Sequence, residues 1–239
     1  MMLIVYIFKL LAILVLGPFY FIVAILTHTV DKDRAFEVFK KYLRLIFRTF
    51  DIQVNFEFDA PEINNSSNSI LVVLNQGSFL DSLVCPLIPI KPFKGIINLE
   101  FALYPIIGWF ITLRSFTIIR QWPSQAKRTL NDASIFLQSG GNMLISIEGK
   151  RSRDGKINEY KKGPIVMAIN NQSNIIPIII YGARECLPFG SLWIKTGTIK
   201  LRFLKPIAAQ GFSYEDRNRL REQLVSIAKN EGLTFRNSN

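Results

Sequence analysis

Histidine and cysteine are scarce in this chain of 239 residues. The one histidine, His28, excludes histidine-rich metal sites and any mechanism that needs two imidazoles. The two cysteines, Cys85 and Cys186, stand alone in apolar stretches without metal-ligand spacing, so we expect reduced core residues and no metal site. Internal repeats and low-complexity linkers are also lacking, and an apolar content of 49% is enough for one sizeable core.

Acidic residues are too few to balance the basic ones. Against 18 Asp and Glu stand 29 Lys and Arg, which gives a net charge of +11. Such an excess indicates an anionic partner, which can be nucleic acid, an anionic membrane surface or a phosphorylated substrate. We exclude nucleic acid, because the sequence has no recognised nucleic-acid motif and no interleaving of aromatic and basic residues, and it begins with an apolar run.

Residues 3–26 are apolar apart from one charge, Lys9. The run is long enough to cross a hydrocarbon core of roughly 30 Å as a helix. Gly17-Pro18 lies in its middle, however, and proline removes a backbone donor and kinks or breaks a helix. The run therefore predicts a membrane anchor, either one kinked transmembrane helix or two short helices that enter and leave one leaflet. It is too long for a signal peptide and has no small-residue cleavage site.

A basic amphipathic helix is predicted next, over residues 33–50, with Thr29 and Asp31 as candidate caps. Four phenylalanines and a leucine recur at helical spacing, and Lys and Arg occupy the other faces. The helix lies either at the lipid surface with its cations near anionic headgroups, or on the protein core with its basic face in water. Positive charge after the first apolar run predicts that the rest of the chain faces the cytoplasm, at the inner membrane.

Short apolar strands alternate with helical stretches in the remainder. Strands are predicted at 52–58, 70–74, 94–98, 115–119, 143–147, 175–180 and 199–204, and helices from about 79 and at roughly 100–112, 124–138, 162–172 and 213–230. Continuous Val and Ile runs separated by helices are typical of the α/β class. We expect a mixed, largely buried sheet flanked by helices, in one domain at 51–239 behind the anchor and amphipathic helix at 1–50.

Two polar clusters follow predicted strands. Residues 75–81, Asn-Gln-Gly-Ser-Phe-Leu-Asp, open a helix where α/β folds place binding sites, although they could simply cap that helix. Residues 148–162 hold six cations and three anions on a glycine-containing loop. Arginine offers phosphate a planar fork of donors, so this second cluster favours a phosphate site over a solvated hairpin.

The two clusters resemble motif blocks of the glycerol-phosphate/lysophospholipid acyltransferases, in particular the bacterial 1-acylglycerol-3-phosphate acyltransferases. Asn75-Gln76-Gly77-Ser78-Phe79-Leu80-Asp81 is similar to the N-H-x-S-x-x-D block, and Glu148-Gly149-Lys150-Arg151-Ser152 to the E-G-T-R-S block. Glu100 to Pro105, Gly108 and Arg120 resemble the second block, which positions the glycerol phosphate, and Ile176-Pro177-Ile178 resembles the fourth. The resemblance spans about residues 50–207, with the core motifs in 70–184.

The resemblance implies transfer of an acyl chain from acyl-CoA or acyl-carrier protein to the free hydroxyl of a lysophospholipid such as 1-acylglycerol-3-phosphate. It implies no cofactor besides the acyl donor, and membrane lipids as partners. Gln76 and Asp81 would form the catalytic pair. The implied substrate-binding residues are Asn75, Ser78, Glu100, Gly108, Arg120, Glu148, Gly149, Lys150, Arg151 and Ser152, with the phosphate on Arg151 and Lys150.

Gln76 departs from the family at the position of its histidine, which accepts the proton of the lysolipid hydroxyl while the aspartate orients the imidazole. A neutral amide cannot act as this base, and losing such a base costs roughly 10²–10⁴-fold in rate. Three hypotheses follow: an acyltransferase in which Asp81 or a water relay replaces the imidazole, a non-catalytic lipid-binding relative, or an active enzyme whose histidine was deliberately replaced. Asn98 and Lys150, where the family has lysine and threonine, indicate natural divergence.

Overall fold

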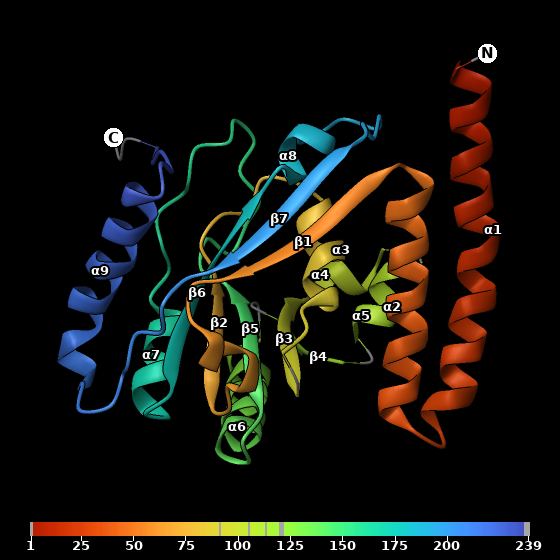
Figure 1. Cartoon of the computed structure of the whole chain (residues 1–239). Coiled ribbons are helices and arrows are strands. Elements are labelled where there is room, and N and C mark those ends of the chain that lie inside the picture. Colours follow the sequence, from red (N-terminus) through yellow and green to blue (C-terminus); the bar gives the residue numbers. More distant parts are fainter. Residues whose placement is uncertain (1, 91, 105, 113, 120–121, 237–239) are drawn as a thin grey trace.

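A seven-stranded sheet forms the centre of the molecule (Figure 1), in a computed structural model that describes residues 2–90, 92–104, 106–112, 114–119 and 122–236. The strands lie in the order β1-β7-β6-β2-β5-β3-β4, and all neighbouring pairs are parallel except β6 and β7. Their bounds are β1 Ile52–Phe58, β2 Ser69–Val73, β3 Phe93–Asn98, β4 Ser115–Ile118, β5 Asn142–Ser146, β6 Asn174–Tyr181 and β7 Gly197–Phe203. Each lies within two residues of its predicted range, and the mixed sheet confirms the α/β class.

Helices cover both faces of this sheet (Figure 1). The α-helices are α1 Met2–His28, α2 Lys32–Thr49, α3 Leu80–Val84, α4 Leu99–Ala102, α5 Ile107–Thr112, α6 Pro123–Gln138, α7 Gly163–Asn170, α8 Ala183–Cys186 and α9 Arg217–Asn230. Short 3-10 helices lie at η1 Pro61–Asn65, η2 Cys85–Leu87 and η3 Tyr214–Asp216. The helices predicted at 124–138 and 162–172 are thus present as α6 and α7, and the one at 213–230 as η3 and α9.

The single helix predicted at 100–112 is wrong, because the structure has two short helices, α4 and α5, in its place. Ile106, directly before α5, has a φ of 66°, in the left-handed region that a continuous helix cannot contain. The backbone N–H of Gly108 then donates to the carbonyl of Tyr104 at 2.9 Å as the second helix begins.

Strand β2 lies at the centre of the core. Leu71 and Val73 pack into the cluster that includes α1, α2 and α3, whereas Ile70 and Val72 pack into the cluster that includes α6, α7 and α9. This alternation follows from the period of two in a strand. Its residues are buried on both faces, as the continuous apolar run predicts for a covered parallel strand.

Helix α1 is continuous from Met2 to His28 with Pro18 inside it, so the alternative of two short helices is wrong. Pro18 has no N–H to donate within the helix. The Tyr42 hydroxyl of α2 donates to the Ile13 carbonyl at 2.9 Å, which ties α1 to α2 in the turn before the proline. A Cβ on Gly17 would come within 2.7 Å of side-chain atoms of Tyr42 and Ile106, so this glycine permits α1 to lie close against α2.

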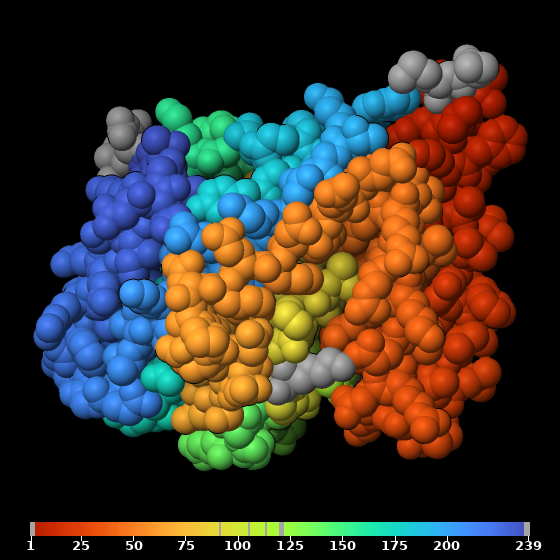
Figure 2. Space-filling model, in the orientation of Figure 1, coloured from red at the N-terminus to blue at the C-terminus, as the bar shows by residue number. Residues whose placement is uncertain are grey.

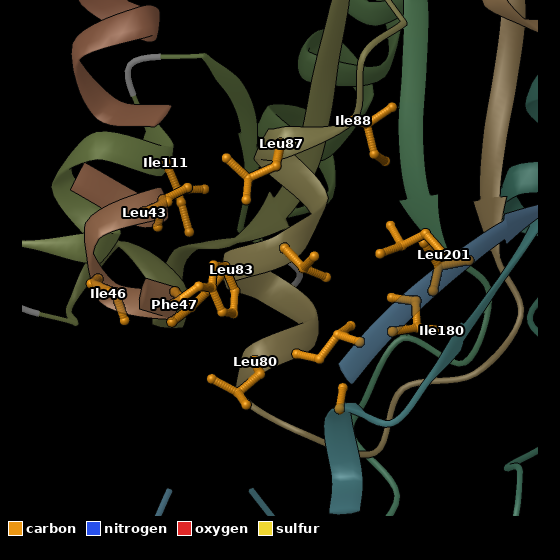
Figure 3. Packing of buried hydrophobic residues seen from close by; sticks show 14 of the residues in the cluster. Leu43, Ile46, Phe47, Leu80, Leu83, Leu87, Ile88, Ile111, Ile180 and Leu201 are labelled. Carbon is orange, nitrogen blue, oxygen red and sulfur yellow. The ribbon is translucent and has the colours of Figure 1, made fainter. Parts of the chain in front are cut away.

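Helix α2 packs on the protein core, which was one of its two predicted positions. Asp31 caps its first turn by accepting from the backbone N–H groups of Asp33 and Arg34 at 2.8 and 3.1 Å, whereas the Thr29 hydroxyl donates to Leu26 of α1 instead. All five apolar residues of the predicted stripe are buried: Phe36, Phe39, Leu43, Phe47 and Phe50. Figure 3 shows part of the cluster that they share with α3, β6 and β7.

The outer face of α1 remains largely uncovered by protein. The most apolar 18-residue window within residues 3–28 has a mean hydropathy of 2.6, and 17% of that window is buried. By length and composition it could cross a membrane. The exposed cations of α2 are Lys32, Arg34, Lys41, Arg44 and Arg48.

Candidate active site

Asn75 continues the pairing of β2 with β6 beyond the end of the strand. Its side-chain amide donates to the Ile180 carbonyl at 2.6 Å and its side-chain oxygen accepts from the Ile180 N–H at 2.8 Å. These two bonds fix where the chain leaves the sheet. The first polar cluster therefore begins at a set position on the carboxyl edge of β2.

Asp81 shapes the turn that follows. Its Oδ2 atom accepts from the backbone N–H groups of Gly77 and Ser78 at 2.8 and 2.7 Å. The Ser78 hydroxyl donates to the Leu187 carbonyl at 2.8 Å and accepts from the N–H of Leu80 at 3.1 Å, which ties the turn to the segment after α8. The Ser78 hydroxyl thus both donates and accepts a hydrogen bond within the protein.

The Asp81 carboxyl group is only 4% exposed. Burial raises its pKa from 3.8 to about 7, against the two backbone hydrogen bonds and Arg151, which lower it, and with a smaller contribution from the charge of Glu148, which raises it. A carboxyl group with this pKa exchanges its proton near neutral pH, as a general base must.

Glu148 joins the two clusters, although 72 residues separate it from Gln76. It is 1% exposed, and its Oε1 atom accepts from the Gln76 N–H at 2.7 Å while Oε2 accepts from the N–H and the side-chain amide of Asn158 at 2.7 and 2.9 Å. Burial raises the pKa of Glu148, and these hydrogen bonds oppose that rise. A second link runs from the Ser152 N–H to the Gln76 carbonyl at 2.7 Å.

The side chain of Gln76 is oriented by Ser146, the last residue of β5. The Ser146 hydroxyl donates to Gln76 Oε1 at 3.1 Å. With its backbone N–H and carbonyl also bonded, Gln76 has one polar group without a partner among the described residues, the side-chain Nε2. Both Gln76 and Ser146 line a cavity, so this amide can donate a hydrogen bond to a bound ligand.

Arg151 lies at the rim of this site. Its guanidinium is 5.7 Å from the Phe79 ring and 5.4 Å from the Phe189 ring, and its Nη2 atom donates to the Tyr104 hydroxyl at 3.4 Å. These contacts hold the planar fork of donors between aromatic side chains. Lys150 beside it is exposed.

Ser152 and Gly149 shape the loop that carries Arg151. The Ser152 hydroxyl donates to the Lys156 carbonyl at 2.7 Å and accepts from the Gly155 N–H at 3.0 Å, so it closes the turn that follows. Gly149 has a φ of +68°, which favours glycine, and it lines the cavity.

The cavity has a volume of about 220 Å³ and lies between the sheet and helices α2, α3 and α5. Because β3, β4 and β5 are parallel, Ser146 and Asn98 mark its end at the carboxyl edge, and Ser115 and Phe93 mark its other end. Arg114 borders that far end and forms an ion pair with Asp33 of α2, with 3.0 Å between Nη2 and Oδ1. The apolar wall of the cavity includes Phe36, Phe39, Val73, Ile96, Ile97, Phe101, Ile111, Leu144 and Ile145.

The second predicted block contributes less to this cavity. Glu100 is exposed on α4 and does not border it, and Arg120 lies outside the described residues. Gly108 permits close packing, since a Cβ there would stand 2.2 Å from the Phe101 carbonyl oxygen. Among the residues that the structure describes, no three His, Cys, Asp or Glu gather into a possible metal site.

Sequence reasoning did not single out Ser146, Asn158 or Phe189. Ser146 is the last residue but one of the strand predicted at 143–147, so its position near the carboxyl edge was a usable signal. Nothing in the sequence brings Asn158 to Glu148 or Phe189 to Arg151, because these contacts depend on how the loops fold over the edge.

Fold and site together define an α/β acyltransferase-like protein, with two motif loops joined at the carboxyl edge over an apolar cavity. Residues 54–181 match the family model described as Acyltransferase. The crystal structure of the 1-acyl-sn-glycerophosphate (LPA) acyltransferase PlsC from Thermotoga maritima has the same fold, with a TM-score of 0.74 and 22% identity over 96% of this chain and 94% of that one. The chain belongs to the acyltransferase family, which confirms the family that the sequence resemblance predicted.

Two plant proteins are among the relatives with similar sequences. The chain is 26% identical over 175 residues to the chloroplastic 1-acyl-sn-glycerol-3-phosphate acyltransferase LPAT1 of Arabidopsis thaliana, covering 71% of this chain and 49% of the relative. It is 24% identical over 205 residues to the chloroplastic 1-acyl-sn-glycerol-3-phosphate acyltransferase BAT2 of Brassica napus, covering 82% of this chain and 59% of the relative. The matched part of the chain thus spans 49% and 59% of the length of these two relatives.

Proposed function

We propose that the chain transfers an acyl group from an acyl thioester to the free hydroxyl of a lysophospholipid such as 1-acylglycerol-3-phosphate. The cavity carries this proposal: it is apolar along most of its length and has Gln76 and Asp81 at one end. An acyl chain in this space places its thioester carbonyl beside the two polar side chains. Each buried methylene contributes about 0.8 kcal/mol to binding. The names of the plant relatives support the choice of acceptor.

Asp81 is the base in this proposal. Its Oδ2 atom is occupied by two backbone donors, so Oδ1 takes the proton of the lysolipid hydroxyl, directly or through a water molecule. The hydroxyl oxygen then forms a bond to the thioester carbon, the carbon–sulfur bond breaks, and the proton passes to the leaving thiolate. The pKa of about 7 suits both the acceptance and the return of this proton.

Gln76 serves as a hydrogen-bond donor in place of a base. With Oε1 held by Ser146, its Nε2 faces the cavity, where the thioester oxygen gains negative charge during the reaction. A donor fixed toward such an oxygen lowers the barrier because it needs no reorganisation as charge develops. Arg151 and Lys150 at the rim bind the phosphate of the acceptor, as their charge and exposure favour.

Membrane attachment through α1 belongs to the same proposal. The uncovered apolar face of the helix suits lipid, and the exposed cations Lys41, Arg44 and Arg48 of α2 suit the anionic headgroups of a cytoplasmic leaflet. The acyl donor is acyl-CoA or acyl-carrier protein, and the rest of the chain faces the cytoplasm.

A non-catalytic lipid-binding protein is the second candidate, and Gln76 is the observation that favours it. The full chain and its Gln76→His variant are compared for acyl transfer to 1-acylglycerol-3-phosphate. We expect measurable transfer by the chain as it stands, lost in Asp81→Asn, and a rise of about 10²-fold or more in Gln76→His. No transfer by either form, with the lysolipid still bound, would instead favour the binding protein.

A further inference from the structure

The loop between α8 and β7, residues 187–196, exposes large apolar side chains at its tip. Leu192 is 90% exposed, and Trp193 and Phe189 are 41% and 38% exposed. Single exposed apolar residues are common on soluble proteins, but three of them within five residues form a patch that calls for a partner.

This tip is fastened to the first turns of α1, more than 180 residues away in sequence. The Tyr6 hydroxyl donates to the Leu192 carbonyl at 2.6 Å and accepts from the Ile194 N–H at 2.9 Å. The Tyr6 ring also stacks on Trp193, with ring centres 4.0 Å apart. Figures 1 and 2 show the tip of the loop beside the N-terminal end of α1. Two hydrogen bonds and a stacked ring pair thus fix the height of the tip along the helix.

The same end of α1 also exposes apolar side chains. Leu3, Ile4, Phe8 and Leu11, in the same part of the helix as Tyr6, are all exposed. Lipid that surrounds this end of α1 therefore lies at the same height along the helix as the tip of the loop.

The other end of the loop lies at the mouth of the catalytic site. Phe189 has the guanidinium groups of Arg151 and Arg153 at 5.4 and 5.6 Å from its ring. Lys195 adds an exposed cation on the side toward β7. The loop therefore presents apolar side chains with cations around them, as a surface that contacts anionic lipid does. A tryptophan beside the apolar tip suits the headgroup level of a bilayer.

We propose that residues 188–195 form a second membrane-contact element, in which Leu192 and Trp193 enter the lipid surface beside α1. The inference rests on the proposed function, since it takes α1 as the primary anchor. Its consequence is positional: the rim that carries Arg151 lies at the bilayer surface, where the phosphate of a lysolipid reaches it without leaving the membrane.

Fluorescence of Trp193 in vesicles tests this directly. The full chain with Trp109→Phe and Trp122→Phe keeps Trp193 as its one tryptophan, and it is reconstituted into phosphatidylcholine–phosphatidylglycerol vesicles that contain brominated acyl chains. We expect strong quenching by bromine near the headgroups and weak quenching by aqueous acrylamide. The matched control replaces all three tryptophans by Phe and carries Ile135→Trp, at a position on α6 that is 58% exposed, and should show the reverse. Equal quenching of both probes by acrylamide, without bromine quenching of Trp193, would overturn the proposal.

Leu192→Asp provides a second, functional measurement. The variant should raise the KM for lysolipid carried in vesicles by about tenfold or more, because a buried leucine contributes on the order of 1.5–3 kcal/mol, while kcat in detergent micelles stays unchanged. Ile135→Asp should leave both values unchanged. If the KM of the Leu192→Asp variant for lysolipid in vesicles were unchanged, the proposal would be contradicted. The fluorescence measurement does not depend on catalysis, so the two proposals can fail separately. If the chain transfers acyl groups but Trp193 is not quenched by brominated lipid, only the membrane-contact element is refuted. If Trp193 is quenched but the chain transfers no acyl group, only the proposed function is refuted.

Discussion

Replacement of Asp81 by asparagine should stabilise the fold while it removes acyl transfer. Both backbone donors to this side chain meet the same oxygen, Oδ2, so the single carbonyl oxygen of an asparagine can accept from the N–H groups of Gly77 and Ser78 in its place. The variant therefore keeps the turn and removes the buried charge.

The magnitude follows from the raised pKa of Asp81. An acid whose pKa is higher in the folded than in the unfolded chain opposes folding once the pH exceeds its ordinary value of 3.8, because the folded chain binds the proton more tightly. The penalty grows through the window from 3.8 to about 7 and is complete above it. Roughly 3 pKa units at about 1.4 kcal/mol each give at most about 4 kcal/mol at pH 8.

Denaturant unfolding of the parent and Asp81→Asn proteins, in the same detergent at pH 8 and pH 5, measures this difference. We expect the variant to be more stable at pH 8, with an advantage that shrinks as the pH falls toward 5 because Asp81 is then protonated in the folded parent. A variant less stable than the parent at pH 8, or an advantage that does not depend on pH, would refute the reasoning.

Three further predictions concern the joined loops and the rim. Glu148→Gln places an amide donor against one of the N–H groups that now donate to the carboxylate, so the unfolding free energy should fall by about 1–3 kcal/mol. Glu222→Gln, at an exposed position of α9, is the control that should leave it unchanged. Arg151→Ala should weaken binding of phosphorylated acceptors far more than that of unphosphorylated ones, and equal weakening in a vesicle-binding assay would contradict the phosphate assignment. Gly108→Ala should lower the melting temperature, because its Cβ would overlap the Phe101 carbonyl, whereas Gly163→Ala, with open space around it, should not.

The strands were predictable from sequence because they are short runs with apolar residues between turn-forming segments, and the Val- and Ile-rich runs such as β2 and β6 are typical of covered sheets. The antiparallel pairing of β6 with β7 could not be predicted, since it depends on the path of the intervening loop. The break between α4 and α5 was missed because apolar spacing alone continues across Ile106, whose left-handed backbone a continuous helix cannot contain.

The site divides in the same way. Residues 75–81 and 148–152 could be found as polar clusters after strands, because parallel strands bring their carboxyl ends to one edge. Three other contacts could not be found from the sequence. They are the hydrogen bond from Gln76 to Glu148, the hydrogen bond from Ser146 that orients the Gln76 amide, and the hydrogen bonds of Tyr6 to the α8–β7 loop. These contacts join segments 70 or more residues apart, and no local pattern in either segment encodes its partner.

The role of Asp81 as base is tested most directly by the pH dependence of acyl transfer. Release of free thiol from acyl-CoA is followed in the presence of 1-acylglycerol-3-phosphate, for the full chain and for Asp81→Asn. The account predicts that kcat/KM rises through a single ionisation near pH 7 and that transfer is lost in Asp81→Asn although the variant remains folded. Transfer that persists in Asp81→Asn with the same pH profile would contradict it.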